Sequence, residues 1–438
     1  MPARPPAIAR VRVTPVAVPD PPLLNAAGCH APYALRSIVE VEDAAGRVGL
    51  GEAYGDDATV DALRAAGERI TGLDPWNLAA VEAGVRSAPP AAPGPAGETA
   101  LGGAAHHAPG ATRSFARNAY AAIEVACLDL QGQHAQVPLA ELLGGRWRDV
   151  VAFSAYLFYK FAQHAPRPDG SPPRPPDAWG EAVDAPGLVR QARRFQEVYG
   201  FTTFKLKGGV FPPEQEVDAV AALRAALGPD VPLRLDPNGI WTVETSVAAG
   251  ARLREIGLEY YEDPTRGMEG MAEVRRRTGL PTATNMCVVG FSDMPRAVRL
   301  APVDYVLSDA HFWGGPRASV RLSALCRDFG IGVSMHSNTH LGVSLAAMVH
   351  AAAAMPHLTA ACDTHYPWQV GHDVIREAWT FRAGRLRVPE APGLGVTLDR
   401  VRLAAMHSDY LTAGLHRRDD GSEMRRHEPG WAYRNPRW

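Results

Sequence analysis

The sequence predicts an α/β protein in which a barrel of alternating strands and helices follows a smaller α+β domain. The first observation is a series of short apolar runs that each end on a polar residue, at steps of 23 to 29 residues. These ends are Lys207, Asp236, Glu262, Asn285, Asp309, His336 and Asp363. The second is that helical patterns such as 213–227 and 316–329 fill the intervals, and the third is strand-like alternation within 11–52. Each step has the length of one strand, one helix and two loops. The repeat therefore favours a (β/α) barrel.

An open, doubly wound sheet is the alternative fold. The even spacing over seven or eight units and the absence of a glycine-rich phosphate-binding turn count against it. Because helices follow the polar ends, these residues are expected at the C-terminal rim of the barrel. Barrel enzymes carry out their chemistry at that rim.

The N-terminal elements are predicted to be strands. Residues 11–18 and 36–42 alternate between apolar and polar side chains, and a turn leads into a third run at 48–52. This pattern predicts a small antiparallel sheet. The loop 24–33 carries two polar side chains among small residues, so it can fold over a site, although surface turns have the same composition.

Helices are expected next. Residues 57–87 have a helical pattern, 114–133 form an amphipathic helix, and 138–145 form a short helix with proline at its start and glycine at its end. Residues 88–113 consist largely of Ala, Gly and Pro and are predicted to be a mobile insertion, and the Pro-rich segment 165–186 to be a surface excursion.

Composition excludes several classes of protein. A formal net charge of −2 and a pI near 6.7 give no electrostatic attraction to nucleic acid or to an anionic membrane. The start of the chain lacks the apolar core of a signal peptide, and the apolar run 341–356 is short and contains His350, which favours a buried helix over a membrane span. Five cysteines without metal-binding spacing suggest reduced thiols in a cytoplasmic protein.

Lysine is rare in this chain, which makes its positions informative. Of 45 basic residues only three are lysine: Lys160, Lys205 and Lys207. On a strand, positions two apart point to the same side, so the last two ammonium groups are expected to share one space. Unlike arginine, lysine can lose its proton when a second cation or a metal lowers its pKa, so we interpret one of this pair as a base. The alternative is an exposed edge strand with solvated lysines.

Three oxygen-bearing side chains end consecutive strands. Asp236, Glu262 and Asn285 are therefore expected to lie side by side, and two carboxylates with an amide oxygen are ligands suited to Mg²⁺. Each residue alone has an ordinary alternative role, as a turn residue or as a cap of the next helix. Their common register beside the lysine pair favours the metal site.

A carboxylate and an imidazole end two further strands. Asp309 and His336 are expected to pair, and the carboxylate would fix the imidazole tautomer and raise its pKa. The alternative is a histidine whose hydrogen bonds go to the backbone. With Lys207 opposite, the metal would lie between two bases, an arrangement suited to removing a proton next to a carboxylate because cations neutralise the enediolate.

These residues resemble the enolase superfamily and, within it, the D-glucarate dehydratases. The resemblance runs through most of the chain. It is carried by the motifs 25–41, 128–145, 205–207, 236–238, 262–264, Asn285, Asp309, 336–338, 363–369 and 418–420. The most specific marks are Asn285, where many relatives carry a carboxylate, and His336-Ser337-Asn338 with the later His365.

The resemblance implies a fold and a site. The fold is an N-terminal α+β capping domain (1–148), a modified TIM barrel of the (β/α)7β type (149–395) and a C-terminal segment (396–438) that returns to the cap. The implied catalytic residues are Lys207, His336, Asp309, Lys205 and Asn338, and the implied ligands of Mg²⁺ are Asp236, Glu262 and Asn285. The implied substrate contacts are Asn25, His30, Tyr156, Lys205, Asn238, Ser337, His365 and Arg418.

The implied activity is that of a cytoplasmic hydro-lyase. It would dehydrate D-glucarate, and also its epimer L-idarate, to 5-dehydro-4-deoxy-D-glucarate, and we expect an assembly of identical subunits. The alternatives are the same mechanism on another acid sugar, an epimerase, and a non-catalytic sugar-acid sensor, against which the complete set of ligands and bases argues. The segments 88–113 and 160–186 and Cys29 depart from the family pattern.

Overall fold

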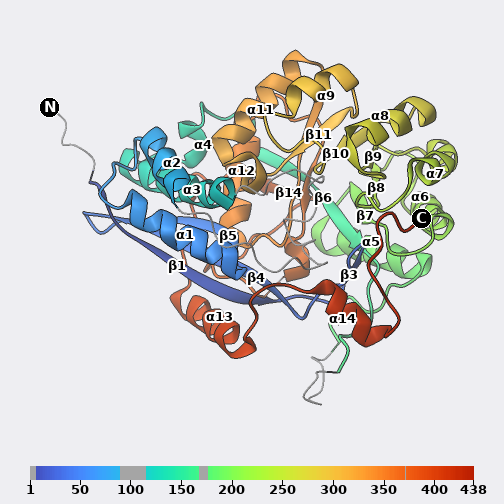
Figure 1. Ribbon diagram of the computed structural model, residues 1–438, viewed down its shortest axis with the longest axis horizontal. Helices are drawn as coiled ribbons and strands as arrows, with labels where there is room; N and C mark the ends of the chain where they lie inside the picture. Colours follow the sequence, from blue (N-terminus) through green and yellow to red (C-terminus); the bar gives the residue numbers. More distant parts are fainter. Residues whose placement is uncertain (1–5, 89–114, 167–175, 370) are drawn as a thin grey trace.

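The computed structural model describes residues 6–88, 115–166, 176–369 and 371–438. Nearly all of the predicted insertion 88–113 and the middle of the Pro-rich segment therefore lie outside the described residues. Within the described part, a small antiparallel sheet lies beside a larger parallel barrel (Figure 1).

The N-terminal sheet has the predicted antiparallel arrangement, in the order β1-β4-β5. Its strands are β1 (Ile8–Pro19), β4 (Tyr33–Asp43) and β5 (Val48–Tyr54). The tight turn after β4 forms because the Asp43 carboxylate accepts hydrogen bonds from the backbone N–H groups of Ala45 and Arg47, at 2.8 and 3.0 Å. A short hairpin, β2 (Leu24–Asn25) and β3 (Gly28–Cys29), forms in the loop between β1 and β4.

Helices α1 (Asp57–Ile70), α2 (Leu78–Ser87), α3 (Phe115–Ala135) and α4 (Leu139–Leu142) complete the cap. The predicted helix 57–87 is two helices, because Gly72, at φ 86°, and Pro75 interrupt it. Glycine on β5 lets α3 approach closely. A Cβ at Gly51 would lie 2.1 Å from the carbonyl oxygen of Ala122, which no real side chain tolerates.

The barrel has eight parallel strands in the order β12-β11-β10-β9-β8-β7-β6-β13 within the described residues. They are β6 (Val150–Phe158), β7 (Phe204–Lys207), β8 (Leu233–Asp236), β9 (Tyr260–Glu262), β10 (Thr282–Thr284), β11 (Tyr305–Ser308), β12 (Gly332–Met335) and β13 (Cys362–Thr364). Hydrogen bonds from Thr359 N to Val333 O (2.9 Å) and from Ser334 Oγ to Ala361 O (2.8 Å) link the β12 and β13 regions and nearly close the ring.

Helices cover the outside of the barrel between successive strands (Figure 1). They are α5 (Ala185–Tyr199), α6 (Pro213–Leu227), α7 (Val243–Ile256), α8 (Gly267–Thr278), α9 (Met294–Leu300), α11 (Pro316–Asp328), which follows the short α10 (Ala310–Trp313), and α12 (Gly342–Ala354). After β13 the described chain forms only the 3-10 helix Tyr366–Gln369 before β14 (Arg385–Arg387), which pairs antiparallel with β6. The predicted (β/α)7β barrel is therefore confirmed.

The C-terminal segment contacts both halves of the molecule. Helix α13 (Arg400–Ala413) lies against β1, where the Nδ1 atom of His407 is 2.7 Å from the carbonyl oxygen of Pro15. Helix α14 (Asp420–His427) packs on β3, and the final residues reach the barrel rim, where Arg437 N donates to Ile240 O at 2.8 Å. The domain boundaries after residues 148 and 395 stay a prediction.

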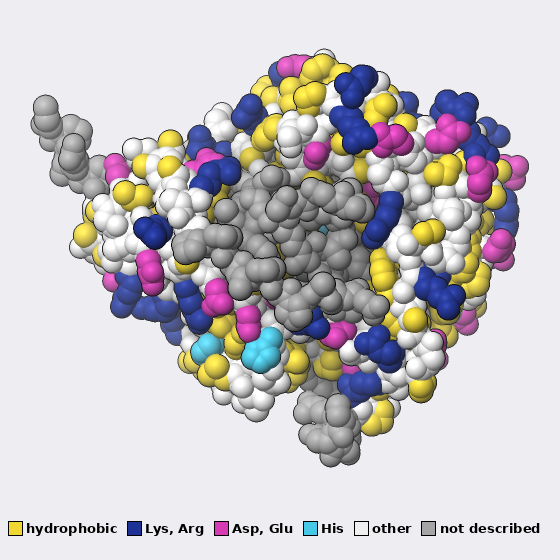
Figure 2. Space-filling model, viewed as in Figure 1, with side chains coloured by type: hydrophobic (Ala, Val, Ile, Leu, Met, Phe, Trp, Pro, Cys, Tyr) yellow, Lys and Arg dark blue, Asp and Glu magenta, His cyan; other side chains and the backbone are white. Residues whose placement is uncertain are grey.

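The surface and core agree with the composition. Basic and acidic side chains are interspersed on the face shown in Figure 2, as the small net charge leads one to expect. In the part of the chain that the structure describes, no helix is long and apolar enough to cross a membrane, and α12 is buried along its whole length, as predicted for 341–356. All five cysteines are free thiols.

Candidate active site

The polar ends of the repeat gather at one end of the barrel. Lys207, Asp236 and Glu262 are the last residues of β7, β8 and β9, and Asn285, Asp309 and His336 directly follow β10, β11 and β12. All six side chains are buried. Because neighbouring parallel strands end at the same edge, these residues form a ring at the mouth of the barrel.

Asp363 lies deeper than predicted. It sits inside β13 rather than at its end, and His365 takes the position beyond the strand. Its carboxylate accepts hydrogen bonds from Lys205 Nζ at 2.5 Å, from Arg234 Nη1 at 3.1 Å and from the Tyr156 hydroxyl at 3.2 Å. Sequence reasoning missed this buried cluster. The sequence did hold a signal for it. Asp363 lies two positions before His365, and residues two apart on a strand point to the same face, so both side chains are expected inside the barrel.

The two lysines share one space, as their spacing predicts. Lys205 Nζ is 4.8 Å and Lys207 Nζ 5.5 Å from the centre of the Tyr156 ring. Lys205 donates to Glu262 Oε2 at 2.7 Å and Lys207 to Asp236 Oδ2 at 2.5 Å. Burial lowers the pKa of Lys205, but the carboxylates of Asp363 and Glu262 outweigh it, and the pKa lies above its ordinary value. Lys205 is therefore suited to holding an anion rather than to accepting a proton.

The three predicted metal ligands fit a divalent cation. Glu262 Oε1 and Asn285 Oδ1 are buried acceptors that have no hydrogen-bond partner among the described residues. Burial also raises the pKa of Glu262 well above its ordinary value, and nearby Lys205 offsets this only in part. Unpaired buried oxygens are costly, and a hard cation such as Mg²⁺ would satisfy both atoms.

The alternative of helix capping is wrong for two of these residues. Helix α8 is preceded by Arg266 and α9 by Asp293, so neither Glu262 nor Asn285 is an N-cap. Asp236 does hold a turn, because its Oδ1 atom accepts from the backbone N–H of Asn238 at 3.0 Å. The other carboxylate oxygen of Asp236, Oδ2, accepts the hydrogen bond from Lys207 Nζ.

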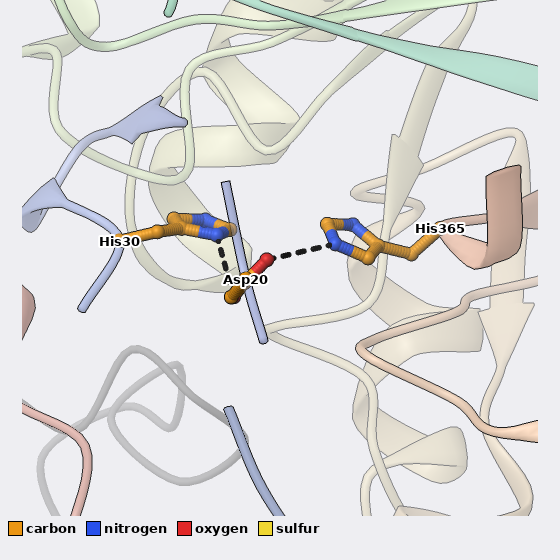
Figure 3. Close-up of side chains that lie close together, drawn as sticks. All are labelled: Asp20, His30 and His365. Atoms are coloured by element: carbon orange, nitrogen blue, oxygen red, sulfur yellow. Dashed lines mark hydrogen bonds and ion pairs between the residues drawn. The ribbon is translucent and has the colours of Figure 1, made fainter. Parts of the chain in front are cut away.

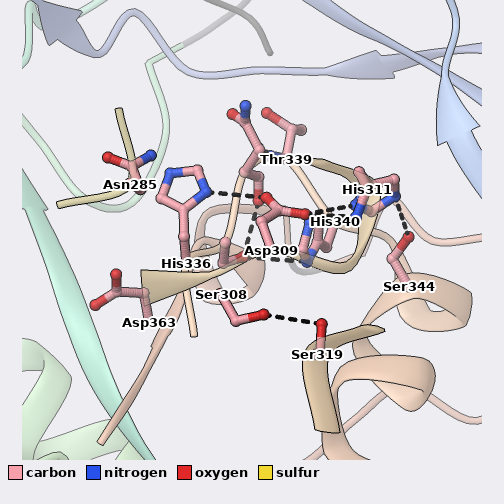
Figure 4. A network of polar contacts seen from close by, with 12 residues as sticks. Asn285, Ser308, Asp309, His311, Ser319, His336, Thr339, His340, Ser344 and Asp363 are labelled. Carbon is pink, nitrogen blue, oxygen red and sulfur yellow. Dashed lines mark hydrogen bonds and ion pairs between the residues drawn. The ribbon is translucent and has the colours of Figure 1, made fainter. Parts of the chain in front are cut away.

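The imidazole of His336 is held by a carboxylate, not by the backbone. The Nδ1 atom of His336 lies 3.0 Å from Asp309 Oδ2 (Figure 4). The other carboxylate oxygen, Asp309 Oδ1, accepts from the backbone N–H of His311 at 2.8 Å and lies 3.0 Å from the Nδ1 atom of His311. The bond between His336 and Asp309 fixes the tautomer of His336 and leaves Nε2 as the basic atom. The expected rise in the pKa of His336 is wrong, however. Burial lowers it, and the Asp309 carboxylate does not compensate fully.

A buried network ties this pair to the cap. Ser344 Oγ and Arg36 Nη2 each lie 3.3 Å from His311 Nε2, and Arg36 Nε donates to Glu52 Oε1 at 2.8 Å. Glu52 in turn accepts from the backbone N–H groups of Leu341 (2.9 Å) and Ser344 (2.7 Å) at the start of α12. The sequence analysis did not predict these contacts. Arg36 was a usable signal, because an arginine among the apolar residues of a strand needs a buried partner.

One pocket collects the predicted substrate contacts. Its empty space, including open solvent at its mouth, is about 470 Å³. Its lining consists of Phe158 and ten predicted site residues: Asn25, His30, Tyr156, Lys207, Asn238, His336, Ser337, Asn338, His365 and Arg418. Lys205 lies one step deeper on β7 and does not line it. The walls come from the cap hairpin, the barrel rim and the C-terminal segment.

Known proteins share this architecture. Residues 187–402 match the family model described as "Enolase C-terminal domain-like". A Streptomyces coelicolor protein named "Probable glucarate dehydratase" is 48% identical over 439 residues, which cover 98% of this chain and 99% of that protein.

Two solved structures superpose on the whole chain. An enolase from Pseudomonas fluorescens with bound magnesium, potassium and tartrate has a TM-score of 0.91 and 48% identity, and covers 99% of this chain and 100% of its own. An enolase from Mycobacterium smegmatis complexed with tartrate has a TM-score of 0.90 and 48% identity, and covers 100% of both chains. The protein therefore belongs to the enolase superfamily.

Proposed function

We propose that the protein is a Mg²⁺-dependent hydro-lyase that converts D-glucarate to 5-dehydro-4-deoxy-D-glucarate. The observation that carries this proposal is one pocket lined by both Lys207 and His336, two potential bases from different sides of the barrel. The similarity to a protein named as a probable glucarate dehydratase supports the choice of an acid sugar.

Asp236, Glu262 and Asn285 would hold the metal. When bound, Mg²⁺ would supply positive charge beside the substrate carboxylate and stabilise negative charge that develops there. The relative from Pseudomonas fluorescens was crystallised with magnesium. In this chain, Lys205 adds a fixed cation next to Glu262, which favours binding of a carboxylate at the same place.

The chemistry needs one base and one acid. Lys207 or His336 removes the proton from the carbon next to the carboxylate, and the electron pair of that C–H bond forms the enediolate. His336, protonated, then donates its proton to the hydroxyl of the next carbon. That C–O bond breaks and water leaves. The resulting enol gains a proton on the carbon that lost the hydroxyl and loses its own O–H proton, which gives the keto acid.

Bases on two sides of the pocket widen the range of substrates. A proton on either face of the carbon can be reached, so we expect L-idarate to react as well as D-glucarate. A dehydratase for another acid sugar and an epimerase are the second candidates, because both would use the same pair of bases.

Proton NMR of the Mg²⁺-loaded protein in D₂O tests the proposal. With D-glucarate, we expect loss of the substrate signals and growth of a 4-deoxy-5-keto product. Deuterium entering glucarate without loss of water would favour an epimerase, or a dehydratase for another acid sugar. Absence of exchange with a panel of acid sugars would favour a non-catalytic sensor.

A further inference from the structure

Three pocket residues contact a single buried carboxylate that no part of the proposed mechanism uses. Asp20 directly follows β1 and is buried. Its Oδ2 atom lies 3.0 Å from His30 Nδ1 and accepts a hydrogen bond from Arg418 Nη1 at 3.1 Å. Its Oδ1 atom lies 3.6 Å from His365 Nε2 (Figure 3). Asp20 itself does not line the pocket.

These three residues form the side of the pocket away from the metal ligands. His365 follows β13, and Asp236 ends β8. In the order of barrel strands, β6 and β7 lie between these two strands. His30 comes from the cap loop and stacks on His365, with ring centres 5.9 Å apart and an interplanar angle of 22°. A six-carbon acid sugar with one carboxylate at the metal would direct its other end toward this group.

Asp20 is itself firmly held. Its backbone N–H donates to Pro32 O at 3.1 Å, and its carbonyl oxygen lies 2.7 Å from His164 Nε2. Burial would raise the pKa of Asp20, but His30 and Arg418 outweigh it and keep the pKa well below its ordinary value. The group is therefore a rigid anion, able to orient the donors around it.

The contacts decide what each neighbour presents to a ligand. Because His30 uses Nδ1–H toward Asp20, its Nε2 atom remains to accept a hydrogen bond from a hydroxyl of the ligand. Arg418 gives one N–H to Asp20 and two to Asp420, at 2.6 and 3.0 Å. Since a guanidinium has five N–H groups, two remain for a ligand.

We propose that Asp20 is a positioning residue for the end of the substrate away from the metal, which it controls by fixing the orientation of His30 and Arg418. This inference rests on the proposed function, because it assumes an acid sugar in the pocket. It assigns to Asp20 the recognition of the terminal group of the sugar and no part in proton transfer.

The test compares Asp20→Ala and Asp20→Asn with the wild type. For Asp20→Ala we expect KM for D-glucarate to rise about 10- to 100-fold, the usual effect of losing hydrogen bonds to a charged group, with a smaller change in kcat. Calorimetry should show unchanged Mg²⁺ affinity, because the metal end is untouched. Asp20→Asn retains an acceptor oxygen but not the negative charge, so it should recover part of the loss.

Asp129→Asn is the matched control. Asp129 is also a buried carboxylate, but it accepts hydrogen bonds from the backbone N–H groups of Leu50 and Leu394 and does not line the pocket. If this control raises KM as much as Asp20→Ala, or if Asp20→Ala weakens Mg²⁺ and glucarate binding equally, the effect is general loosening and the inference is wrong.

Failure of the proposed function gives a different result. If the wild type binds D-glucarate in calorimetry without converting it, the function is wrong, and the same comparison of affinities still decides the role of Asp20. If the wild type binds no acid sugar, both proposals are wrong.

Discussion

Lys207 and His336 line one pocket from strands on different sides of the barrel, which supports the proposal that each acts on one face of a bound acid. We expect Lys207→Arg to abolish proton exchange with one of the two epimers, D-glucarate or L-idarate, and to leave the other exchanging through His336. Loss of a general base costs about 10²- to 10⁴-fold in rate. Exchange measured by NMR in D₂O checks this, and retained exchange with both epimers would show that Lys207 is not a base.

His336→Asn gives the complementary result. Because His336 is also the proposed acid, dehydration of both epimers should cease, while Lys207 still exchanges the proton of one of them. Dehydration that survives in this variant would remove His336 from the role of acid.

Asn285 gives the proposed metal site one negative charge fewer than a set of three carboxylates would have. A neutral amide would keep more positive charge on the metal, which suits a substrate with two carboxylates. We expect Asn285→Asp to weaken binding of D-glucarate more than binding of a sugar acid with one carboxylate, measured by calorimetry with Mg²⁺. Equal losses for the two ligands would contradict this explanation.

At the scale of elements, the loop after β7 is fixed by a buried carboxylate from helix α6. Glu216 accepts from the backbone N–H groups of Gly209, Val210 and Phe211 at 2.9, 2.8 and 3.0 Å. These residues closely follow Lys207, so Glu216 sets the path of the chain beside a proposed base. Burial raises the pKa of Glu216 to about 7, from an ordinary value of 4.5, despite these three bonds.

This shift predicts a pH dependence of stability. Between pH 4.5 and about 7 the folded protein retains a proton that the unfolded chain has lost, so the contribution of Glu216 to stability falls as pH rises. The difference in unfolding free energy between wild type and Glu216→Gln should therefore decrease over this range, by up to about 3 kcal/mol. Urea unfolding at several pH values measures it. Glu214→Gln, an exposed position in the same helix, should parallel the wild type.

At the scale of the whole molecule, the cap and the barrel are joined through Glu52. Glu52, on strand β5 of the N-terminal sheet, accepts hydrogen bonds from two backbone N–H groups at the start of α12. The N-cap residue of α12, Leu341, has no side-chain hydrogen bond of its own to this helix end. We expect Glu52→Gln to lower the unfolding free energy by about 1–3 kcal/mol, because it weakens charged hydrogen bonds at a buried helix terminus. Hydrogen exchange should show lost protection at Leu341 and Ser344.

Glu42→Gln is the control for this change. Glu42 lies on β4 of the same sheet and pairs with Arg10 near the surface. Surface ion pairs contribute little, so its loss should cost less than about 1 kcal/mol. Equal losses in the two variants would show that Glu52 has no special role in joining the two halves.

The sequence alone predicts the barrel and its rim because these depend on local patterns. Strand and helix lengths fix the spacing of Lys207, Asp236 and Glu262, and the end of a strand places each side chain at the mouth. The contacts of Asp20 with His365 and Arg418, and those of Asp363 with Lys205 and Arg234, could not be predicted in this way, since these partners lie far away in the sequence. The pKa of His336 was predicted in the wrong direction for a related reason: the depth of burial follows from the packed structure and not from the motif.

The hydrogen bond from Asn25 Nδ2 to Asp420 Oδ2 spans 395 residues of sequence. A ribosome adds about 5–20 residues per second, so about 20–80 seconds separate the synthesis of its two ends. The barrel strands are all made within that interval, before Asp420 exists to hold the cap loop. A nascent chain can therefore carry the barrel strands with both proposed bases while its pocket is still open, and chains that end before Asp420 should be inactive toward substrate.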